Sequence, residues 1–314
     1  KIKEKSEYSL TSWIETIPFP LASILRSWQA SLPSDYKSKY EYLLHFFEAT
    51  SQFLSIIYIS AFEKDNYCEE YRNDLVNKME RKGFDLRRAT FGSWMFIIKH
   101  YSKITRKLLI NNQKLSDNLD NQRRLKEMFQ DNSLNIPELI SQTSIIHLLE
   151  EANKIRNNTR GHGGVIDDLN ARIINDQLIN LLEELRTLMD NIWDKTTLVR
   201  GMHGHNKGGR YINAIEIFKG SSTPFNKDYR ELVEIIDSDS LFLIFEDQPG
   251  VLKLEPLMQI SSSPQSARNA CYFYTSLNNN GAKFVSYHHA SDAILEGSEF
   301  IETISVIRKL SSKK

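Results

Sequence analysis

The feature that most constrains the fold of this chain is a change in its hydrophobic pattern near residue 200. Before that point, long stretches carry apolar residues at three- and four-residue steps, the spacing of one face of an α-helix, most clearly from Tyr36 to about Phe62. After it, apolar residues gather in short runs such as Leu241 to Phe245, which is typical of a strand buried on both faces. The sequence therefore predicts an α+β protein, helical first and β-containing second.

Helix start and stop signals divide the first part of the chain. Pro18 is typical of a first helical turn, and Asp35 is a good N-cap for the long helix that follows it. Gly161 and the glycines after it interrupt the helical pattern, and Asp167 opens the last helix. The expected elements are a polar lead-in over 1–17, helices over 21–30, 36–62, 71–81, 90–109, 137–157 and 168–193, and an exposed helix or mobile connection over 111–135.

The glycine-rich stretch over 201–209 predicts a loop and a domain boundary. We expect a helical domain over 18–199, and a smaller β-containing domain of unknown role over 210–314. Strands are expected only after about residue 205. They are placed at 211–218, 232–236, 241–245, 251–260 and 283–288, with 267–277 either helix or strand and 297–310 left open.

Composition narrows the class of protein. The 314 residues include 40 Lys and Arg against 40 Asp and Glu, so bulk positive charge does not hold this chain on nucleic acid, although a local basic patch remains open. Cys68 and Cys271 give neither a disulfide framework nor a metal spacing, which favours a reducing cytoplasmic location. No apolar run reaches the roughly 18 residues of a membrane span, and no signal peptide is visible, so no membrane partner is expected. The chain starts at Lys1 rather than Met, so the sequence leaves open whether further domains precede it.

The stretch from Arg156 to His162 carries the most chemical information in the sequence. It reads Arg-Asn-Asn-Thr-Arg-Gly-His, and it lies between the end of one predicted helix and the start of the next. A histidine titrates near neutrality and can act as acid or base. An arginine is a permanent two-donor partner for phosphate oxygens. The neighbouring Asn157 can orient either group, and the glycines around His162 let the backbone turn the ring toward Arg156.

These residues resemble the active-site motif of HEPN ribonucleases, small helical bundles with an Arg, four to six residues, and a His, often with Asn directly after the Arg. The resemblance covers about residues 18–199. It implies a metal-independent endoribonuclease of a bacterial defence or toxin system, without cofactor or metal. Arg156 would bind phosphate, Asn157 would orient the groups, and His162 would be the acid–base residue. It also implies an RNA substrate, a homodimer, and other domains or subunits of a defence system as partners.

Two interpretations compete with this one. In the first, the chain is a non-catalytic HEPN-like dimerisation or sensing module, and Arg156 to His162 is a helix end followed by a plain turn. In the second, it is a nucleic-acid-binding specificity domain of a larger defence or restriction protein. Aromatic and basic residues on predicted strands would then bind bases and phosphates, unless they form a strand core with polar edges. These residues are Arg268, Tyr272, Phe273, Tyr274, Lys283, Tyr287, His288 and His289.

Other candidate side chains have an ordinary interpretation beside the functional one. Glu48 either pairs with Arg156, as the HEPN resemblance allows, or faces solvent, which we favour from sequence alone. Glu150 and Glu151 are expected on a solvated helix face. His203 and His205 are weak evidence for a metal because no Cys or carboxylate stands at ligand spacing. The remaining helical histidines, His45, His100 and His147, are expected to be packing or surface residues.

Overall fold

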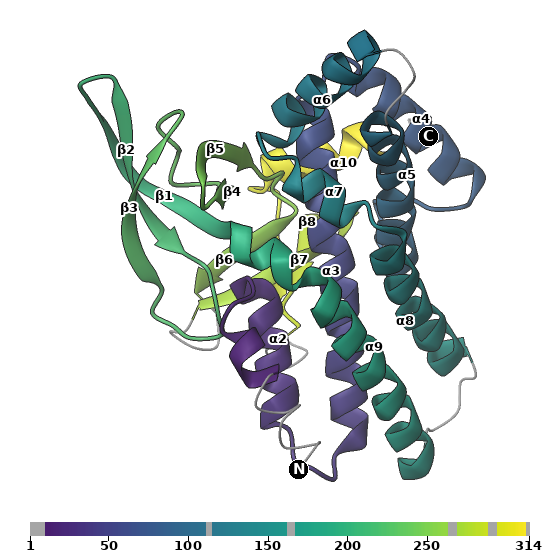
Figure 1. Ribbon diagram of the computed structural model, residues 1–314. Coiled ribbons are helices and arrows are strands. Elements are labelled where there is room, and N and C mark those ends of the chain that lie inside the picture. The colour runs from purple at the N-terminus through teal and green to yellow at the C-terminus, as the bar shows by residue number, and fades with distance from the viewer. Residues whose placement is uncertain (1–9, 111–114, 162–166, 263–268, 288–293, 312–314) are drawn as a thin grey trace.

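The computed structural model describes residues 10–110, 115–161, 167–262, 269–287 and 294–311. Up to residue 195 the described elements are helices, and two antiparallel sheets and one short helix follow (Figure 1). The predicted α+β class is therefore confirmed. In the described part of the chain, no helix is both long and apolar enough to cross a membrane.

Local sequence signals explain where the main helices begin. The Asp35 side chain accepts a hydrogen bond from Ser38 N–H, and Asp167 accepts one from Asn170 N–H. Thr90 and Ser93 form a capping box, in which each side chain satisfies the other's backbone N–H. The helices are α2 (Phe19–Ala30), α3 (Tyr36–Glu63), α4 (Cys68–Arg81), α5 (Phe91–Leu109), α6 (Leu115–Phe129), α7 (Asn135–Ile140), α8 (Thr143–Gly161), α9 (Asp168–Lys195) and α10 (Ile301–Lys309).

Two helical predictions need correction. The single helix expected over 137–157 is two helices, because α7 ends at Ile140 and α8 begins at Thr143. The Arg106 side chain donates to the Ser141 carbonyl at this break and so satisfies a group left free at the helix end. The polar lead-in is also wrong for its last part: residues 10–14 are helical, and Trp13 is buried against Phe46.

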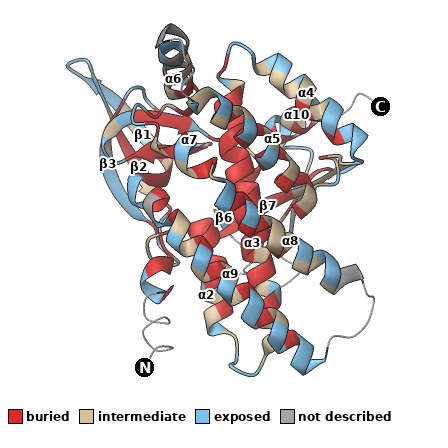
Figure 2. Ribbon diagram, turned by 45° about the vertical axis from the view of Figure 1, so that its right-hand side comes forward, coloured by how far each residue is buried: buried red, intermediate tan, exposed pale blue. Residues whose placement is uncertain are grey.

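Helix α3 is the centre of the molecule. Almost every residue from Leu43 to Phe62 is buried, and the other helices and the second sheet surround it (Figure 2). A helix that is buried on all sides must also hide its polar side chains. Thr50, Ser51, Ser55 and Ser60 do so by donating to the carbonyl four residues earlier.

The strands form two separate sheets. The first sheet has the order β3-β2-β1-β4-β5 and the second has the order β6-β7-β8-β9, with all neighbours antiparallel. The strands are β1 (Thr196–Lys207), β2 (Arg210–Ile217), β3 (Asn226–Leu232), β4 (Leu241–Phe245), β5 (Gln248–Lys253), β6 (Met258–Ser262), β7 (Asn269–Asn278), β8 (Gly281–Val285) and β9 (Ile294–Gly297).

The glycine-rich stretch is mostly strand, so the predicted loop is wrong. Strand β1 follows α9 directly and begins at Thr196, earlier than expected. Gly201 and Gly204 lie where neighbours come close: a Cβ on Gly201 would be 2.5 Å from the Asp237 carbonyl oxygen. Only Gly208 and Gly209 form a turn, and both have the positive φ that a two-residue hairpin requires.

The other strand predictions are partly right. Strand β4 and β2 lie where expected, and β4 is buried along its whole length. The strand expected over 232–236 is wrong, because β3 ends at Leu232 and is formed mainly by the polar residues before it. The segment 251–260 is divided between β5 and β6, and 267–277 is strand β7.

The first sheet curves around its own apolar core. This core contains residues from all five strands, including Val199, Ile215, Leu232, Phe242 and Val251. The two edge strands approach each other at one point, where Val233 N–H donates to the Pro249 carbonyl at 3.0 Å. The sheet is therefore a partly open barrel.

The second sheet packs against the helices instead. Buried Gln52 of α3 donates to the carbonyls of Leu257 and Tyr274, and the Tyr274 hydroxyl donates to the Leu86 carbonyl. The largest apolar cluster accordingly runs from α2, α3 and α5 into β6, β7 and β8 without interruption.

Candidate functional site

Arg156 lies near the end of α8 and faces the centre of the helical bundle. Its Nη2 atom is 3.3 Å from Oε2 and 3.4 Å from Oε1 of Glu48, which belongs to α3. The guanidinium carbon lies 6.0 Å from the centre of the Phe91 ring at the start of α5, within the range of a cation–π contact. Three helices thus meet at this arginine.

Both charges of this ion pair are largely removed from water. The Arg156 side chain is 15% exposed and the Glu48 side chain 9%. The solvent-facing interpretation of Glu48 is therefore wrong, and its pairing with Arg156 is what the structure contains. The Arg156 Nε–H is buried and has no hydrogen-bond partner among the described residues. A buried donor without a hydrogen-bond partner costs free energy, and an acceptor placed at this N–H would recover it.

The other two residues of the motif are placed differently. Asn157 is exposed at the same end of α8. His162 directly follows the helix, which ends at Gly161, and it lies outside the described residues. The structure therefore brings Arg156 to Glu48, and it gives no distance from either residue to His162.

Two buried polar groups on α8 and α9 were not predicted from the sequence. Asn153 lies one turn before Arg156 on α8, and Asn175 is buried on the adjacent helix α9. The side-chain oxygen of each is buried without a hydrogen-bond partner in the described part of the chain. The spacing of Asn153 and Arg156 could have revealed the first, because residues three apart share a helix face. Nothing in the sequence marks Asn175.

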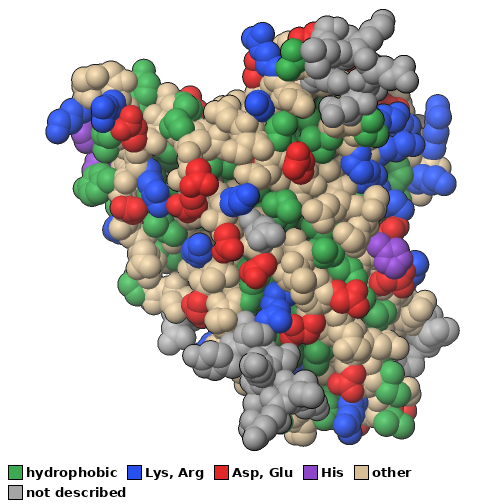
Figure 3. Space-filling view, in the orientation of Figure 1, with side chains coloured by type: hydrophobic (Ala, Val, Ile, Leu, Met, Phe, Trp, Pro, Cys, Tyr) green, Lys and Arg blue, Asp and Glu red, His purple; other side chains and the backbone are tan. Residues whose placement is uncertain are grey.

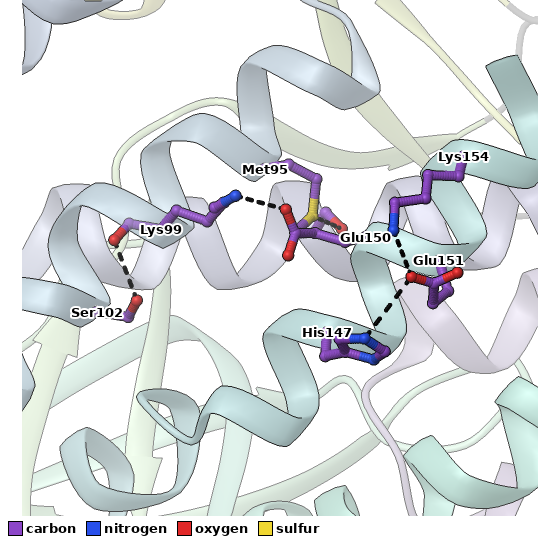
Figure 4. Close-up of polar contacts among 8 residues, drawn as sticks. Met95, Lys99, Ser102, His147, Glu150, Glu151 and Lys154 are labelled. Carbon is purple, nitrogen blue, oxygen red and sulfur yellow. Dashed lines mark hydrogen bonds and ion pairs between the residues drawn. The ribbon is translucent and has the colours of Figure 1, made fainter.

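The carboxylates earlier on α8 belong to the surface. Glu150 binds Lys99 of α5 at 2.5 Å, and Glu151 lies between His147 and Lys154 (Figure 4). A hydrogen bond from Lys154 lowers the pKa of Glu151. Exposed ion pairs of this kind contribute little to stability. Glu150 and Glu151 are thus engaged with surface cations and are not directed at Arg156.

Three aromatic residues of the cluster predicted in the last part of the chain lie in a strand core. Tyr272, Phe273 and Tyr274 are almost fully buried in β7, so they cannot stack on a base. Tyr287 stacks on His45 of α3, with ring centres 4.8 Å apart. Arg268, His288 and His289 lie outside the described residues. For Tyr272, Phe273 and Tyr274, the interpretation as a nucleic-acid-binding surface is therefore wrong, and the interpretation as a strand core is correct.

Other reactive side chains are either dispersed or hidden. His203 and His205 are exposed on β1, and no three His, Cys, Asp or Glu side chains gather as metal ligands in the ranges that the structure describes. Burial raises the pKa of the Cys271 thiol, which disfavours the thiolate. A cavity of about 530 Å³ is lined by barrel residues such as Thr197, Ile244 and Arg230, and it does not include Arg156.

The burial of His100 in α5 predicts how the stability of the protein depends on pH. Its side chain is buried, Nε2 lies 3.7 Å from Asp74, and burial lowers the pKa of His100 below its ordinary value of 6.5. Below pH 6.5 the unfolded chain binds a proton at His100 more readily than the folded protein does. The free energy of unfolding is therefore highest above pH 6.5, and it decreases as the pH falls toward the lower pKa of His100 in the folded protein. We expect His100→Phe to reduce the loss of stability below pH 6.5, measured by urea unfolding across pH. An unchanged pH slope in this variant would contradict the prediction.

Comparisons with known proteins do not extend this description. No protein-family model matches the chain, and no match was found among curated proteins or solved structures.

Proposed function

We propose that this chain is a metal-independent endoribonuclease of a bacterial defence or toxin system. The observation that carries the proposal is the buried ion pair between Arg156 and Glu48 at the end of α8. The pair holds a permanent cation on α8, and His162 is the residue that follows this helix in the sequence. RNA as substrate, and other subunits or a second copy as partners, belong to the same proposal.

The ion pair supports phosphate binding by fixing the guanidinium. Glu48 engages one terminal nitrogen of Arg156, and Phe91 lies 6.0 Å from the guanidinium carbon. A guanidinium has five N–H donors and Glu48 contacts only Nη2, so other donors remain for phosphate oxygens. A cation that is already oriented stabilises developing charge without reorganising during the reaction.

The proposed reaction uses the hydroxyl next to the scissile phosphate. A base removes the proton of the 2′-hydroxyl, and that oxygen forms a bond to phosphorus. The bond from phosphorus to the 5′-oxygen breaks, and the departing oxygen receives a proton. His162 serves as the acid–base group, Arg156 balances the extra negative charge on the phosphate oxygens, and exposed Asn157 orients the substrate or the histidine. The products are a 2′,3′-cyclic phosphate and a 5′-hydroxyl.

A non-catalytic dimerisation or sensing module is the second candidate. It is favoured by the burial of the same ion pair, because an arginine that already has a carboxylate partner is sufficient to join α8 to α3. In that case Arg156 and Glu48 matter for stability alone, and His162 has no chemical role.

Incubation of the purified protein with RNA in excess EDTA separates the two candidates. The ribonuclease proposal predicts that single-stranded RNA is cut, and that DNA and 2′-O-methyl RNA of the same sequence resist because the attacking hydroxyl is missing or blocked. His162→Ala is the negative control. Cleavage of the 2′-O-methyl strand, or no cleavage of any RNA by folded protein, would favour the second candidate or a different nuclease chemistry.

A further inference from the structure

Strand β3 is an edge of the first sheet, and along Asn226 to Tyr229 the described part of the chain places no strand beside its outer side. It pairs with β2 on one side, and its residues from Asn226 to Tyr229 are exposed. It lies on the side of the barrel away from the helices (Figure 1), and charged and apolar side chains share this face of the molecule (Figure 3). Tyr229 is 64% exposed, which is unusual for a large aromatic side chain.

The free backbone groups of this edge can be identified. Tyr229 N–H donates to the Asp228 side chain at 2.8 Å, so it points away from β2. Ladder bonds alternate along a strand, and Lys227 and Glu231 therefore present their backbone groups outward as well. Lys227, Tyr229 and Glu231 also share one face of the strand, and Asp228 and Arg230 share the other.

We propose that β3 is the contact by which two copies of this chain associate, as antiparallel neighbours around a two-fold axis at Tyr229. In this register the two Tyr229 residues face each other. Lys227 lies opposite Glu231 of the second copy, and Asp228 lies opposite Arg230 of the second copy. Every charge on the strand thus meets an opposite charge, and symmetry repeats each pair.

The alternative registers are unfavourable. The smallest shift that keeps outward-facing backbone groups opposite each other is two residues, and it places Arg230 opposite Arg230 in one direction and Asp228 opposite Asp228 in the other. Like charges directly opposite each other are destabilising, so the sequence of β3 selects the symmetric register. Charged side chains usually protect an exposed edge from pairing, but here they restrict it to one partner strand.

The contacts within one copy leave the two outer charges of this pairing, Lys227 and Glu231, accessible. Lys227 has no ion pair in the described part of the chain, and Glu231 is 3.7 Å from Arg210 at an exposed position. Arg230 contacts Asp228 at 3.3 Å and Glu246 at 3.1 Å. On association the Asp228 carboxylate exchanges its contact with Tyr229 N–H for Arg230 of the second copy, and that N–H bonds to the facing strand.

Charge exchange on β3 tests this interface by sedimentation over a range of concentrations. Lys227→Glu and Glu231→Lys should each raise the dissociation constant of the dimer by about tenfold, because two attractions become two repulsions. The double variant Lys227→Glu/Glu231→Lys should restore association, and so should a mixture of the two single variants, in which one strand is acidic at both positions and the other basic. Tyr229→Pro should prevent association by removing the central outward N–H, which an edge strand tolerates.

Lys78→Glu is the matched control, because it reverses one exposed lysine of α4 and should leave association unchanged. A wild-type chain that stays monomeric at the highest attainable concentration would overturn the proposal. So would a dimer that none of the β3 variants weakens, or single variants that neither the double variant nor mixing restores. This inference rests on the geometry and charges of β3 and does not rest on the ribonuclease proposal.

Discussion

Replacing His162 by alanine is expected to lower the rate of RNA cleavage by roughly 10²–10⁴-fold, the usual contribution of a positioned acid–base group. Arg156→Lys should also be nearly inactive, because an ammonium cannot bind Glu48 and a phosphate with the fixed planar donors of a guanidinium. The rates should be measured under single-turnover conditions, so that product release does not mask the chemical step.

His147→Ala is the matched control for this experiment. His147 lies on the same helix with an exposed side chain that contacts Glu151, and its removal should leave the rate unchanged. Unfolding curves of each variant separate loss of chemistry from loss of structure. A His162→Ala protein that is folded and cuts RNA at the wild-type rate would remove His162 from the mechanism.

Glu48→Ala is expected to lower the free energy of unfolding by about 3–5 kcal/mol, because it leaves Arg156 as an uncompensated charge in a largely buried position. Replacing both partners by apolar residues, as in Glu48→Leu/Arg156→Met, should cost much less, because no unpaired charge is then buried. Urea unfolding monitored by circular dichroism gives both values.

Glu150→Ala provides the comparison for the Glu48 variant. It breaks the exposed ion pair with Lys99 on a neighbouring face of α8 and should cost at most about 1 kcal/mol. Equal losses for Glu48→Ala and Glu150→Ala would mean that the buried pair is no more important to the fold than a surface pair. A double variant as unstable as Glu48→Ala would show that packing, and not charge, is lost at Glu48.

The helices were predictable because their signals are local. The apolar periodicity of α3, the Asp35 and Asp167 caps, and the apolar run of β4 are properties of neighbouring residues. The glycine-rich strand was not predictable in this way. Gly201 and Gly204 fit β1 because Asp237 and Asn213, which belong to other segments of the folded barrel, approach the backbone there.

The same distinction applies to the candidate site. The position of Arg156 at the end of a helix follows from the glycines after it, and this was predicted. The burial of Glu48 was not predicted. Helix α3 is buried on all sides, and its sequence alone does not say which of its polar residues contacts a partner. Tyr272, Phe273 and Tyr274 were ambiguous for a similar reason, since only the packing of β7 against the helices makes them core residues.

The ends of the RNA fragments test most directly whether Arg156 and His162 act on the neighbouring 2′-hydroxyl. Fragments produced by the wild-type protein in excess EDTA should carry 2′,3′-cyclic phosphate and 5′-hydroxyl ends, identified by mass spectrometry and by resistance to 5′-phosphate-dependent exonuclease. His162→Ala should yield neither fragments nor these ends above background. Fragments with 5′-phosphate ends, or cleavage that EDTA abolishes, would contradict the proposed mechanism even if the protein proves to be a nuclease.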